Sequence, residues 1–268
     1  KVEDKPEVKK AGGVYYTPTY IVDYIVKNTV GKILEGKTPA EVSGESAKAD
    51  HPVRILDPAC GSGSFLLGAY EYLLTWYRDE YIKTGPEKYT KGKEPKLYES
   101  AGGAWKLTTS ERKRILLNHI YGVDIDSQAV EVTKLSLLLK VLEGETKESV
   151  STQRRLFNER ALPDLSRNIK CGNSLIGSDF YKDKQLDLFN EEERIRINAF
   201  DWEDEFKEVF KAGGFDAVIG NPPYVLLQNE FRDDEQLEYI RSHFEVASYK
   251  IDTYHLFIER FIKLLKNR

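Results

Sequence analysis

The sequence contains no methionine, only two cysteines and only four histidines among its 268 residues. The two cysteines, Cys60 and Cys171, provide neither the ligand spacing of a zinc site nor a disulfide framework. The histidines are scattered and form no HExxH or similar motif, so we expect no metal ion in this protein. Because even position 1 is not methionine, we interpret the chain as an incomplete piece of a longer protein.

Long apolar runs are also lacking, and this argues against a membrane protein. No run approaches the roughly 18 apolar residues of a membrane span. The charged N-terminus, Lys1–Lys5, lacks the apolar core of a signal peptide. We therefore expect a cytoplasmic protein without a membrane partner. The 40% of hydrophobic and 31% of charged residues are typical of a folded globular domain.

Positive charge is not in excess either. The net charge of −4 weakly disfavours a nucleic-acid partner when it is taken alone, because DNA binding needs a basic surface. Bulk charge excludes neither a local basic groove nor a separate recognition domain that makes most of the contacts.

The hydrophobic pattern predicts strands that alternate with helices. Short apolar runs predict four strands, at 53–57, 120–123, 168–171 and 215–219. Helical spacing predicts helices at 18–35, 65–82, 110–118, 129–142, 201–211, 234–242 and 253–266. The helix at 129–142 is expected to turn these apolar side chains inward: Val130, Leu135, Leu138, Leu139 and Leu142. Polar composition predicts a loop at 37–52 and an inserted loop at 83–107. The alternation indicates an α/β fold with a mostly parallel sheet covered by helices on both faces.

Polar motifs follow each predicted strand, where an α/β sheet binds its ligands. The first motif, DPACGSGSF over residues 57–65, joins an acid that ends a strand to two glycines and the start of a helix. Gly61 and Gly63 let the backbone turn sharply and approach a ligand, and the helix start offers free N–H groups. A tight strand-to-helix turn is the plainer alternative, but the acidic residue favours cofactor binding.

Three further motifs follow the other strands. Asp124 ends the second strand and is placed to bind ribose hydroxyls, whereas Asp126 competes for that role or caps the next helix. Asn173, after the third strand, is a weaker signal because asparagine and serine are common turn residues.

The fourth motif, Asn221-Pro222-Pro223-Tyr224, follows the last strand. Two prolines stiffen the turn and remove competing N–H groups. The Asn221 side-chain oxygen and the Pro222 carbonyl can accept from one amine, and Tyr224 offers a flat face to a flipped base. A proline turn with a core tyrosine is the alternative.

In this order, YYTP (15–18), DPACGSGSF, GVDID, GNSL (172–175) and NPPY resemble the gamma group of N6-adenine DNA methyltransferases, above all the modification parts of type I and type IIG restriction–modification and phage-exclusion enzymes. The resemblance spans residues 12–266. It implies a Rossmann-like fold, S-adenosylmethionine as cofactor and DNA with a flipped adenine as partner. A specificity domain or subunit is a further expected partner.

The resemblance also implies roles for individual residues. It assigns Asn221, Pro222, Pro223 and Tyr224 to the target adenine. It assigns the cofactor to Tyr16, Thr17, Pro18, Asp57, Ala59, Cys60, Gly61, Gly63, Phe65, Asp124, Ile125, Asn173, Ser174 and Asn221. The implied reaction is direct transfer of a methyl group to the amine, without a covalent enzyme intermediate or a metal ion.

The family's sheet has seven strands, and only four are identified here. We therefore expect an N-terminal helical segment over residues 1–52 and a partial catalytic domain over residues 53–268, truncated after the fourth strand, without a target-recognition domain. Two alternatives stay open. One is a methyltransferase that acts on protein glutamine, since such enzymes carry NPPY too, or on RNA adenine. The other is a non-catalytic, cofactor-binding subunit of a restriction complex.

Overall fold

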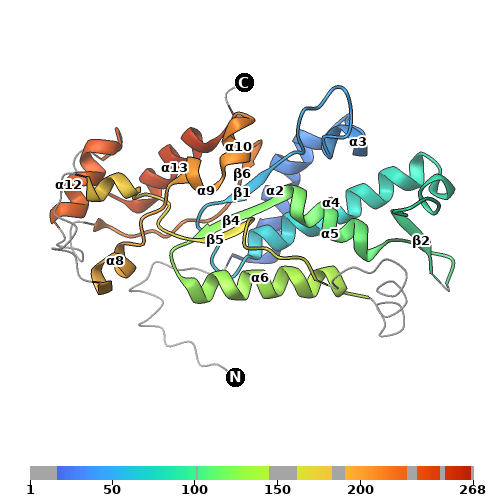
Figure 1. Cartoon of the computed structure of the whole chain (residues 1–268), viewed down its shortest axis with the longest axis horizontal. Coiled ribbons are helices and arrows are strands. Elements are labelled where there is room, and N and C mark those ends of the chain that lie inside the picture. Colours follow the sequence, from blue (N-terminus) through green and yellow to red (C-terminus); the bar gives the residue numbers. More distant parts are fainter. Residues whose placement is uncertain are drawn as a thin grey trace.

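The computed structural model describes residues 17–100, 102–144, 162–182, 191–227, 234–247 and 251–266. Its centre is a parallel sheet in the order β5-β4-β1-β6 (Figure 1). The strands are β1 (Ile55–Asp57), β4 (Ile120–Asp124), β5 (Ile169–Cys171) and β6 (Ala217–Val218). Counted along the chain, this order is 3-2-1-4, as in the first part of a doubly wound sheet. The predicted parallel α/β architecture is confirmed.

Side chains of β1 alternate between two apolar layers, because successive residues of a strand point to opposite faces. Ile55 belongs to the larger cluster and Leu56 to the smaller one. The larger cluster joins one face to α2 (Thr19–Leu34), α4 (Ser64–Lys83), α5 (Thr109–His119) and α6 (Ser127–Leu142). The smaller one includes residues of α9 (Trp202–Glu205), α10 (Lys207–Lys211) and α13 (Thr253–Leu264) on the other face. Helices therefore cover both faces, as expected (Figure 1).

A third apolar cluster lies around the loop that follows β5. Leu175 and Ile176 of this loop pack with Ile240, Phe244 and Leu256. The cluster also contains Phe180 and Ile197, so it brings together the 3-10 turn η2 (Ser178–Tyr181), α8 (Glu191–Ile197), α12 (Asp234–His243) and α13. No described helix is long and apolar enough to cross a membrane.

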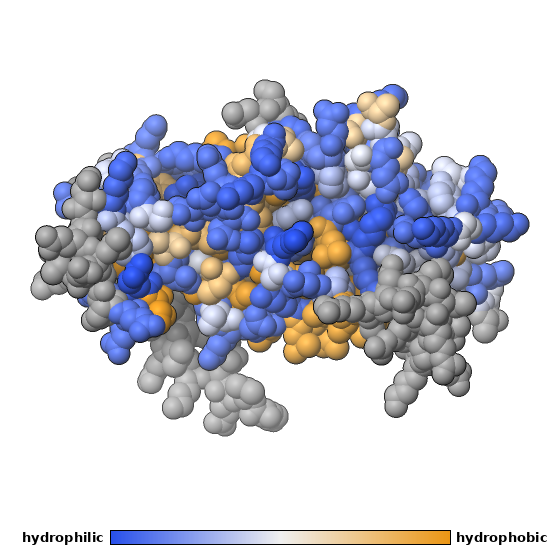
Figure 2. Space-filling view, viewed as in Figure 1, coloured by the Kyte–Doolittle hydropathy of each residue, from blue (hydrophilic) through white to orange (hydrophobic). Residues whose placement is uncertain are grey.

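The prediction for the inward face of α6 was partly wrong. Val130 is buried, but Leu135 and Leu139 are 57% and 60% exposed. Thr133 and Leu137 are buried in their place, since they share the face of Val130 at helical spacing. Because α6 is apolar on several sides, the pattern alone does not identify its inner face. Figure 2 shows the resulting apolar patch over α6.

Both predicted loops contain regular structure. The segment 37–52 includes α3 (Pro39–Val42), which begins with a capping box between Thr38 and Glu41. The insert 83–107 contains the 3-10 turn η1 (Pro86–Tyr89) and an antiparallel pair of strands, β2 (Leu97–Glu99) and β3 (Trp105–Leu107).

Two buried leucines, Leu97 and Leu107, attach this hairpin to the core that contains α4. The predicted helix at 201–211 is likewise divided at Phe206 into α9 and α10. Composition gave no signal for either feature, because one or two anchoring residues decide them.

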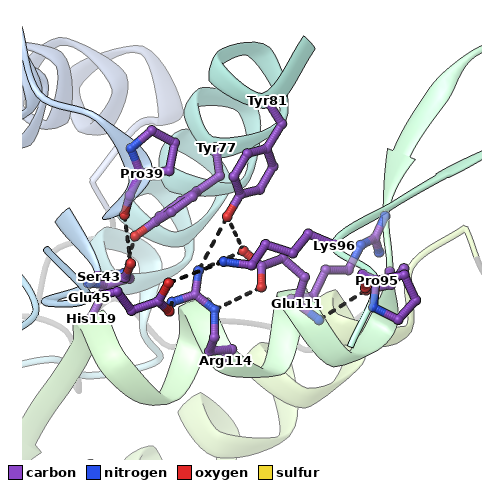
Figure 3. A network of polar contacts seen from close by, with 12 residues as sticks. Pro39, Ser43, Glu45, Tyr77, Tyr81, Pro95, Lys96, Glu111, Arg114 and His119 are labelled. Atoms are coloured by element: carbon purple, nitrogen blue, oxygen red, sulfur yellow. Dashed lines mark hydrogen bonds and ion pairs between the residues drawn. The ribbon is translucent and has the colours of Figure 1, made fainter. Parts of the chain in front are cut away.

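A polar network is buried near the amino ends of the strands (Figure 3). The Nδ1 atom of His119 lies 2.6 Å from the Val53 carbonyl oxygen, and its Nε2 atom lies 2.8 Å from the Tyr77 hydroxyl. A carbonyl can only accept, so Nδ1 carries the proton and Nε2 accepts from Tyr77. Burial therefore keeps the ring neutral and lowers the pKa of His119 to about 4.

The same network contains a buried carboxylate. Glu111 is 3% exposed and accepts from the Tyr81 hydroxyl at 2.6 Å. Two nitrogens of Arg114 bind the Glu111 carboxylate at 2.6 and 2.8 Å. Burial opposes the charge of Glu111, but these hydrogen bonds hold its pKa below the ordinary value. Glu45, which follows α3, and Lys96, which precedes β2, extend the network.

The neutral His119 makes stability depend on pH. The unfolded chain binds a proton at this residue below about pH 6.5 and the folded chain only near pH 4, so stability falls as the pH drops through this window. The difference corresponds to about 3 kcal/mol of unfolding free energy. We expect His119→Gln, which does not titrate, to lose this part of the pH dependence. Denaturant unfolding of both proteins from pH 7 to pH 4 measures it, and equal slopes would contradict the assignment.

Candidate active site

The loop after β1 is a tight turn built on two glycines. Gly61 and Gly63 have φ angles of 51° and 85°, which lie in the left-handed region that favours glycine. The Thr133 hydroxyl of α6 donates to the Gly61 carbonyl oxygen at 2.7 Å and fixes the turn from below. A methyl group on Gly63 would lie 2.9 Å from Thr133, whereas one on Gly61 would meet no atom within 4 Å. The backbone at Gly61 is therefore open to a ligand.

Asp57, the last residue of β1, is almost fully buried. Its carboxylate is 1% exposed and accepts from the Ala59 N–H at 3.1 Å. Burial raises the pKa of Asp57 to about 8, and the charge of Asp124 adds to this effect. The backbone of Gly220, after β6, lies against it, because a Cβ atom there would stand 2.5 Å from Oδ1 of Asp57. This contact joins the first motif to the last.

Asp124 ends β4 and faces the same loop. Its two carboxylate oxygens accept from Gly61 N at 2.7 Å and from Asp126 N at 3.0 Å. Burial raises the pKa of Asp124 despite these bonds. Each carboxylate oxygen has a second lone pair for a ligand. The adjoining Ile125 is 51% exposed and offers an apolar surface beside the acid.

Asp126 takes the capping role of the two that the sequence left open. Its side chain accepts from Gln128 N at 2.9 Å at the start of α6. Asp126 therefore stabilises the start of α6 rather than the open side of the loop after β1.

The GNSL loop after β5 is held by its own side chains. Asn173 donates from Nδ2 to the Ile197 carbonyl and accepts at Oδ1 from Leu175 N. Ser174 is 5% exposed and its hydroxyl donates to the Pro58 carbonyl oxygen at 2.5 Å. The Ser174 bond connects the loop after β5 to the loop after β1. These hydrogen bonds of Asn173 and Ser174 are thus structural ones.

Two further residues of the first motif point into the core. Cys60 and Phe65 are 5% and 4% exposed and belong to the larger apolar cluster. Burial raises the pKa of the Cys60 thiol. A ligand above this loop would meet their backbone rather than their side chains.

Asn221 lies between the N-terminal motif and Tyr224. Its Nδ2 atom donates to the Thr17 hydroxyl oxygen at 3.2 Å, and its Oδ1 atom accepts from the Tyr224 hydroxyl at 2.8 Å. The YYTP and NPPY motifs therefore meet at the Asn221 side chain, although Thr17 and Asn221 are 204 residues apart. Pro18 follows directly as the N-cap of α2. Tyr16 lies outside the described residues.

The aromatic ring of Tyr224 is 48% exposed, so it remains accessible. It stacks on Tyr254 of α13, with 5.2 Å between the ring centroids and 18° between the planes. Pro222 is buried and Pro223 half-buried. The Thr253 hydroxyl donates to the Pro223 carbonyl oxygen.

The structure brings the four predicted motifs together at the carboxyl edge of the sheet. The contacts are Thr17 with Asn221, Asp57 with Gly220, Asp124 with Gly61, and Ser174 with Pro58. Sequence analysis missed Thr133, Gly220 and Thr253. A glycine directly after the last strand was the available signal for Gly220, whereas no local pattern marks the two threonines. Among the described residues, no group of histidine, cysteine and acidic side chains is arranged to hold a metal ion.

Comparison with known proteins agrees with this arrangement. The family model described as "Eco57I restriction-modification methylase" matches residues 118–268, and that of "N-6 DNA Methylase" matches residues 5–160. The type II restriction enzyme and methyltransferase RM.Eco57I of Escherichia coli is 34% identical over 254 residues, which are 94% of this chain and 22% of RM.Eco57I. The adenine-specific methyltransferase PglX of Streptomyces coelicolor is 24% identical over 83% of this chain and 15% of PglX.

Solved structures show the same fold. The type ISP restriction–modification enzyme LlaGI, a nuclease-deletion mutant in complex with a DNA substrate mimic, superposes with a TM-score of 0.52 and 19% identity. The match covers 94% of this chain and 17% of the LlaGI chain. The type ISP enzyme LlaBIII bound to DNA gives a TM-score of 0.51 and 16% identity over 94% of this chain and 14% of its own.

The parallel sheet in 3-2-1-4 order, with its motif loops at one edge, defines a Rossmann-like methyltransferase fold. Within that class, the chain belongs to the Eco57I-type N6-adenine DNA methylases of restriction–modification systems. A methylase uses a methyl-donor cofactor. The chain spans about a fifth of the length of RM.Eco57I.

The two glycines of the first motif allow a matched test of its packing. We expect Gly63→Ala to be the more damaging change, because it adds a clash with Thr133 to the backbone strain. Overpacking costs about 1–3 kcal/mol, and the left-handed backbone about 1–2 kcal/mol. Gly61→Ala should carry only the backbone cost. Denaturant unfolding of both variants measures the difference, and equal losses would show that Thr133 gives way freely.

Asp57 predicts a second pH effect of opposite sign. Its pKa of about 8 in the folded chain lies above the ordinary 3.8, so the folded state binds more protons between these values and stability falls as the pH rises. The loss approaches about 1.4 kcal/mol per pH unit. Asp57→Asn should therefore flatten the curve and be more stable than the parent at pH 8. Unfolding at pH 5.5 to 8.5 tests this, and a variant less stable at pH 8 would rule out an uncompensated buried acid.

Proposed function

We propose that this chain is the catalytic part of an enzyme that transfers a methyl group from S-adenosylmethionine to the N6 amine of a flipped adenine in DNA. The observation that carries the proposal is the position of Asn221. Its amide is held by Thr17 on one side and faces the Tyr224 hydroxyl on the other. It thus presents an acceptor oxygen beside an accessible aromatic ring, which suits an amine on a flat base.

The described residues fit the proposed cofactor. A buried acid, Asp57, and a half-buried acid, Asp124, belong to the same edge of the sheet as the open glycine backbone at Gly61, which donates to Asp124. The charge of Asp124 adds to the raised pKa of Asp57, and neighbouring carboxylates of this kind favour a cationic ligand. Asp124 has lone pairs for ribose hydroxyls, and the exposed Ile125 suits the face of an adenine ring. When bound, S-adenosylmethionine supplies an electrophilic methyl group that is attached to a positively charged sulfur atom.

The residues of this chain act by positioning. Asn221 Oδ1 and the Pro222 carbonyl each accept one N–H of the target amine, which draws its nitrogen towards tetrahedral geometry and exposes the lone pair. Bound S-adenosylmethionine would supply the methyl group to this lone pair as its sulfonium became a neutral thioether, and the amine would lose one proton to water. Tyr224 supports the base by stacking, which is worth about 1–3 kcal/mol. Alignment and electrostatics supply the catalytic effect.

DNA is the proposed substrate because the chain belongs to the N6 DNA methylase family and resembles, in fold, enzymes whose structures contain DNA or a DNA mimic. A specificity domain or subunit would read the bases around the flipped adenine. Transfer to protein glutamine or RNA adenine is the alternative. Labelled cofactor offered with DNA, RNA and a release-factor-like protein to the full-length protein separates these substrates, and label in DNA alone is the expected result.

Mutations in the full-length protein distinguish the proposed target-amine site from the proposed cofactor site. We expect Asn221→Ala to lower kcat by about 10²-fold or more while cofactor affinity stays nearly unchanged. Asp124→Ala should weaken cofactor binding by about 10- to 100-fold, since a charged hydrogen bond is lost. Asp126→Ala is the matched control, because this acid caps α6 and should leave affinity intact.

Calorimetric titration with S-adenosylmethionine and a DNA methylation assay provide the measurements. Loss of cofactor binding in Asn221→Ala would contradict its assignment to the target amine. Binding without transfer in the parent protein would support the non-catalytic subunit instead.

A further inference from the structure

The loop that carries Tyr224 is held by a residue from a distant part of the chain. Thr253 begins α13, and its hydroxyl makes two hydrogen bonds to this loop. It donates to the Pro223 carbonyl oxygen at 2.5 Å and accepts from the Val225 N–H at 3.0 Å. The Thr253 side chain is therefore attached to the backbone immediately before and immediately after Tyr224.

The surrounding backbone explains why a side chain makes these bonds. Residues after Tyr224 run antiparallel to the segment before α13, with Leu227 N bonded to the Ile251 carbonyl and Thr253 N bonded to the Val225 carbonyl. In a regular ladder, Val225 N–H would bind the Thr253 carbonyl in return. Thr253 is the first residue of a helix, so its carbonyl points along the helix axis. The hydroxyl takes the place of that carbonyl.

The hydroxyl also extends the pairing to Pro223. Proline has no N–H group, so the ladder has no backbone donor at that position. Thr253 is 8% exposed, and its bonds are thus shielded from competing water. The bond to Thr253 fixes the carbonyl of Pro223, the residue directly after the Pro222 carbonyl that is proposed to receive the target amine together with Asn221 Oδ1.

We propose that Thr253 is a positioning residue for methyl transfer: its hydroxyl fixes the backbone on both sides of Tyr224 and so sets the geometry in which Asn221 and Pro222 receive the target amine. This inference rests on the proposed function of the same site. It adds a residue that does not touch substrate or cofactor and acts through the loop.

Three variants of the full-length protein test the inference. Thr253→Val keeps the shape of the side chain and removes both hydrogen bonds. Thr253→Ser keeps the hydroxyl. Asp252→Ala removes the neighbouring cap of α13, in which the Asp252 side chain accepts from Tyr254 N, and leaves the Thr253 hydroxyl in place. Asp252→Ala therefore controls for a general weakening of the helix start.

The assay follows labelled methyl transfer to unmethylated genomic DNA, with calorimetric titration of S-adenosylmethionine. We expect Thr253→Val to lower kcat by about 10- to 100-fold, because small misplacements at a reacting centre have effects of this size. Its cofactor Kd should stay within about twofold of the parent value, since the residue acts on the target side. Thr253→Ser should restore kcat to within about threefold of the parent, and Asp252→Ala should resemble the parent.

The outcomes separate this inference from the proposed function. A parent protein that transfers methyl groups, together with an unimpaired Thr253→Val, overturns the role of Thr253 alone. An equal loss in Asp252→Ala and Thr253→Val, or a failure of Thr253→Ser to recover, overturns it as well, because the residue would then only support the helix. A parent protein that binds the cofactor but transfers no methyl group overturns both proposals.

Discussion

The contact between the Asp57 carboxylate and the Gly220 backbone is the constraint on which the rest of the site depends. Strands β1 and β6 pair in parallel, with Leu56 opposite Val218, so their chains leave the sheet side by side. A single Cβ atom on Gly220 would stand 2.5 Å from the Asp57 oxygen. Any side chain there would separate the strand ends and displace Asn221, the next residue. The absence of a Cβ atom at Gly220 thus sets the distance between the loop proposed to bind the cofactor and the loop proposed to bind the target base.

The structure separates stability from function along the strands. The buried His119–Tyr77 and Glu111–Arg114 bonds lie near the amino ends, whereas the motif loops lie at the carboxyl ends. At the amino ends, the buried His119 ring and the buried Glu111 carboxylate each have hydrogen-bond partners that offset their desolvation. At the carboxyl ends, Asp57 keeps a raised pKa, and its burial is only partly compensated. Such residual destabilisation is typical of a ligand-binding site.

The sheet was predictable because each strand is a short apolar run that ends in a polar motif, and parallel strands bring such ends to one edge. Sequence patterns gave a wrong prediction where a feature depended on which side of a helix faces the core rather than on composition. Leu135 and Leu139 of α6 are as apolar as the buried Leu137 but lie on the opposite side of the helix. Exchangeable roles were decided by single contacts: Asp126 caps α6, and Ser174 binds the first loop instead of facing outward.

The contacts between motifs could not be predicted, since they join residues that are distant in sequence and chemically ordinary. Hydroxyl groups make two of them, Thr17 to Asn221 and Ser174 to Pro58, and two further hydroxyl groups hold the motif loops, Thr133 to Gly61 and Thr253 to Pro223. For the bonds to Pro58 and Pro223, the reason lies in the proline itself. Prolines expose carbonyls without matching N–H groups, so a partner must donate. Thr253 must also accept from Val225, and a hydroxyl can do both at once where an ammonium or a carboxylate cannot.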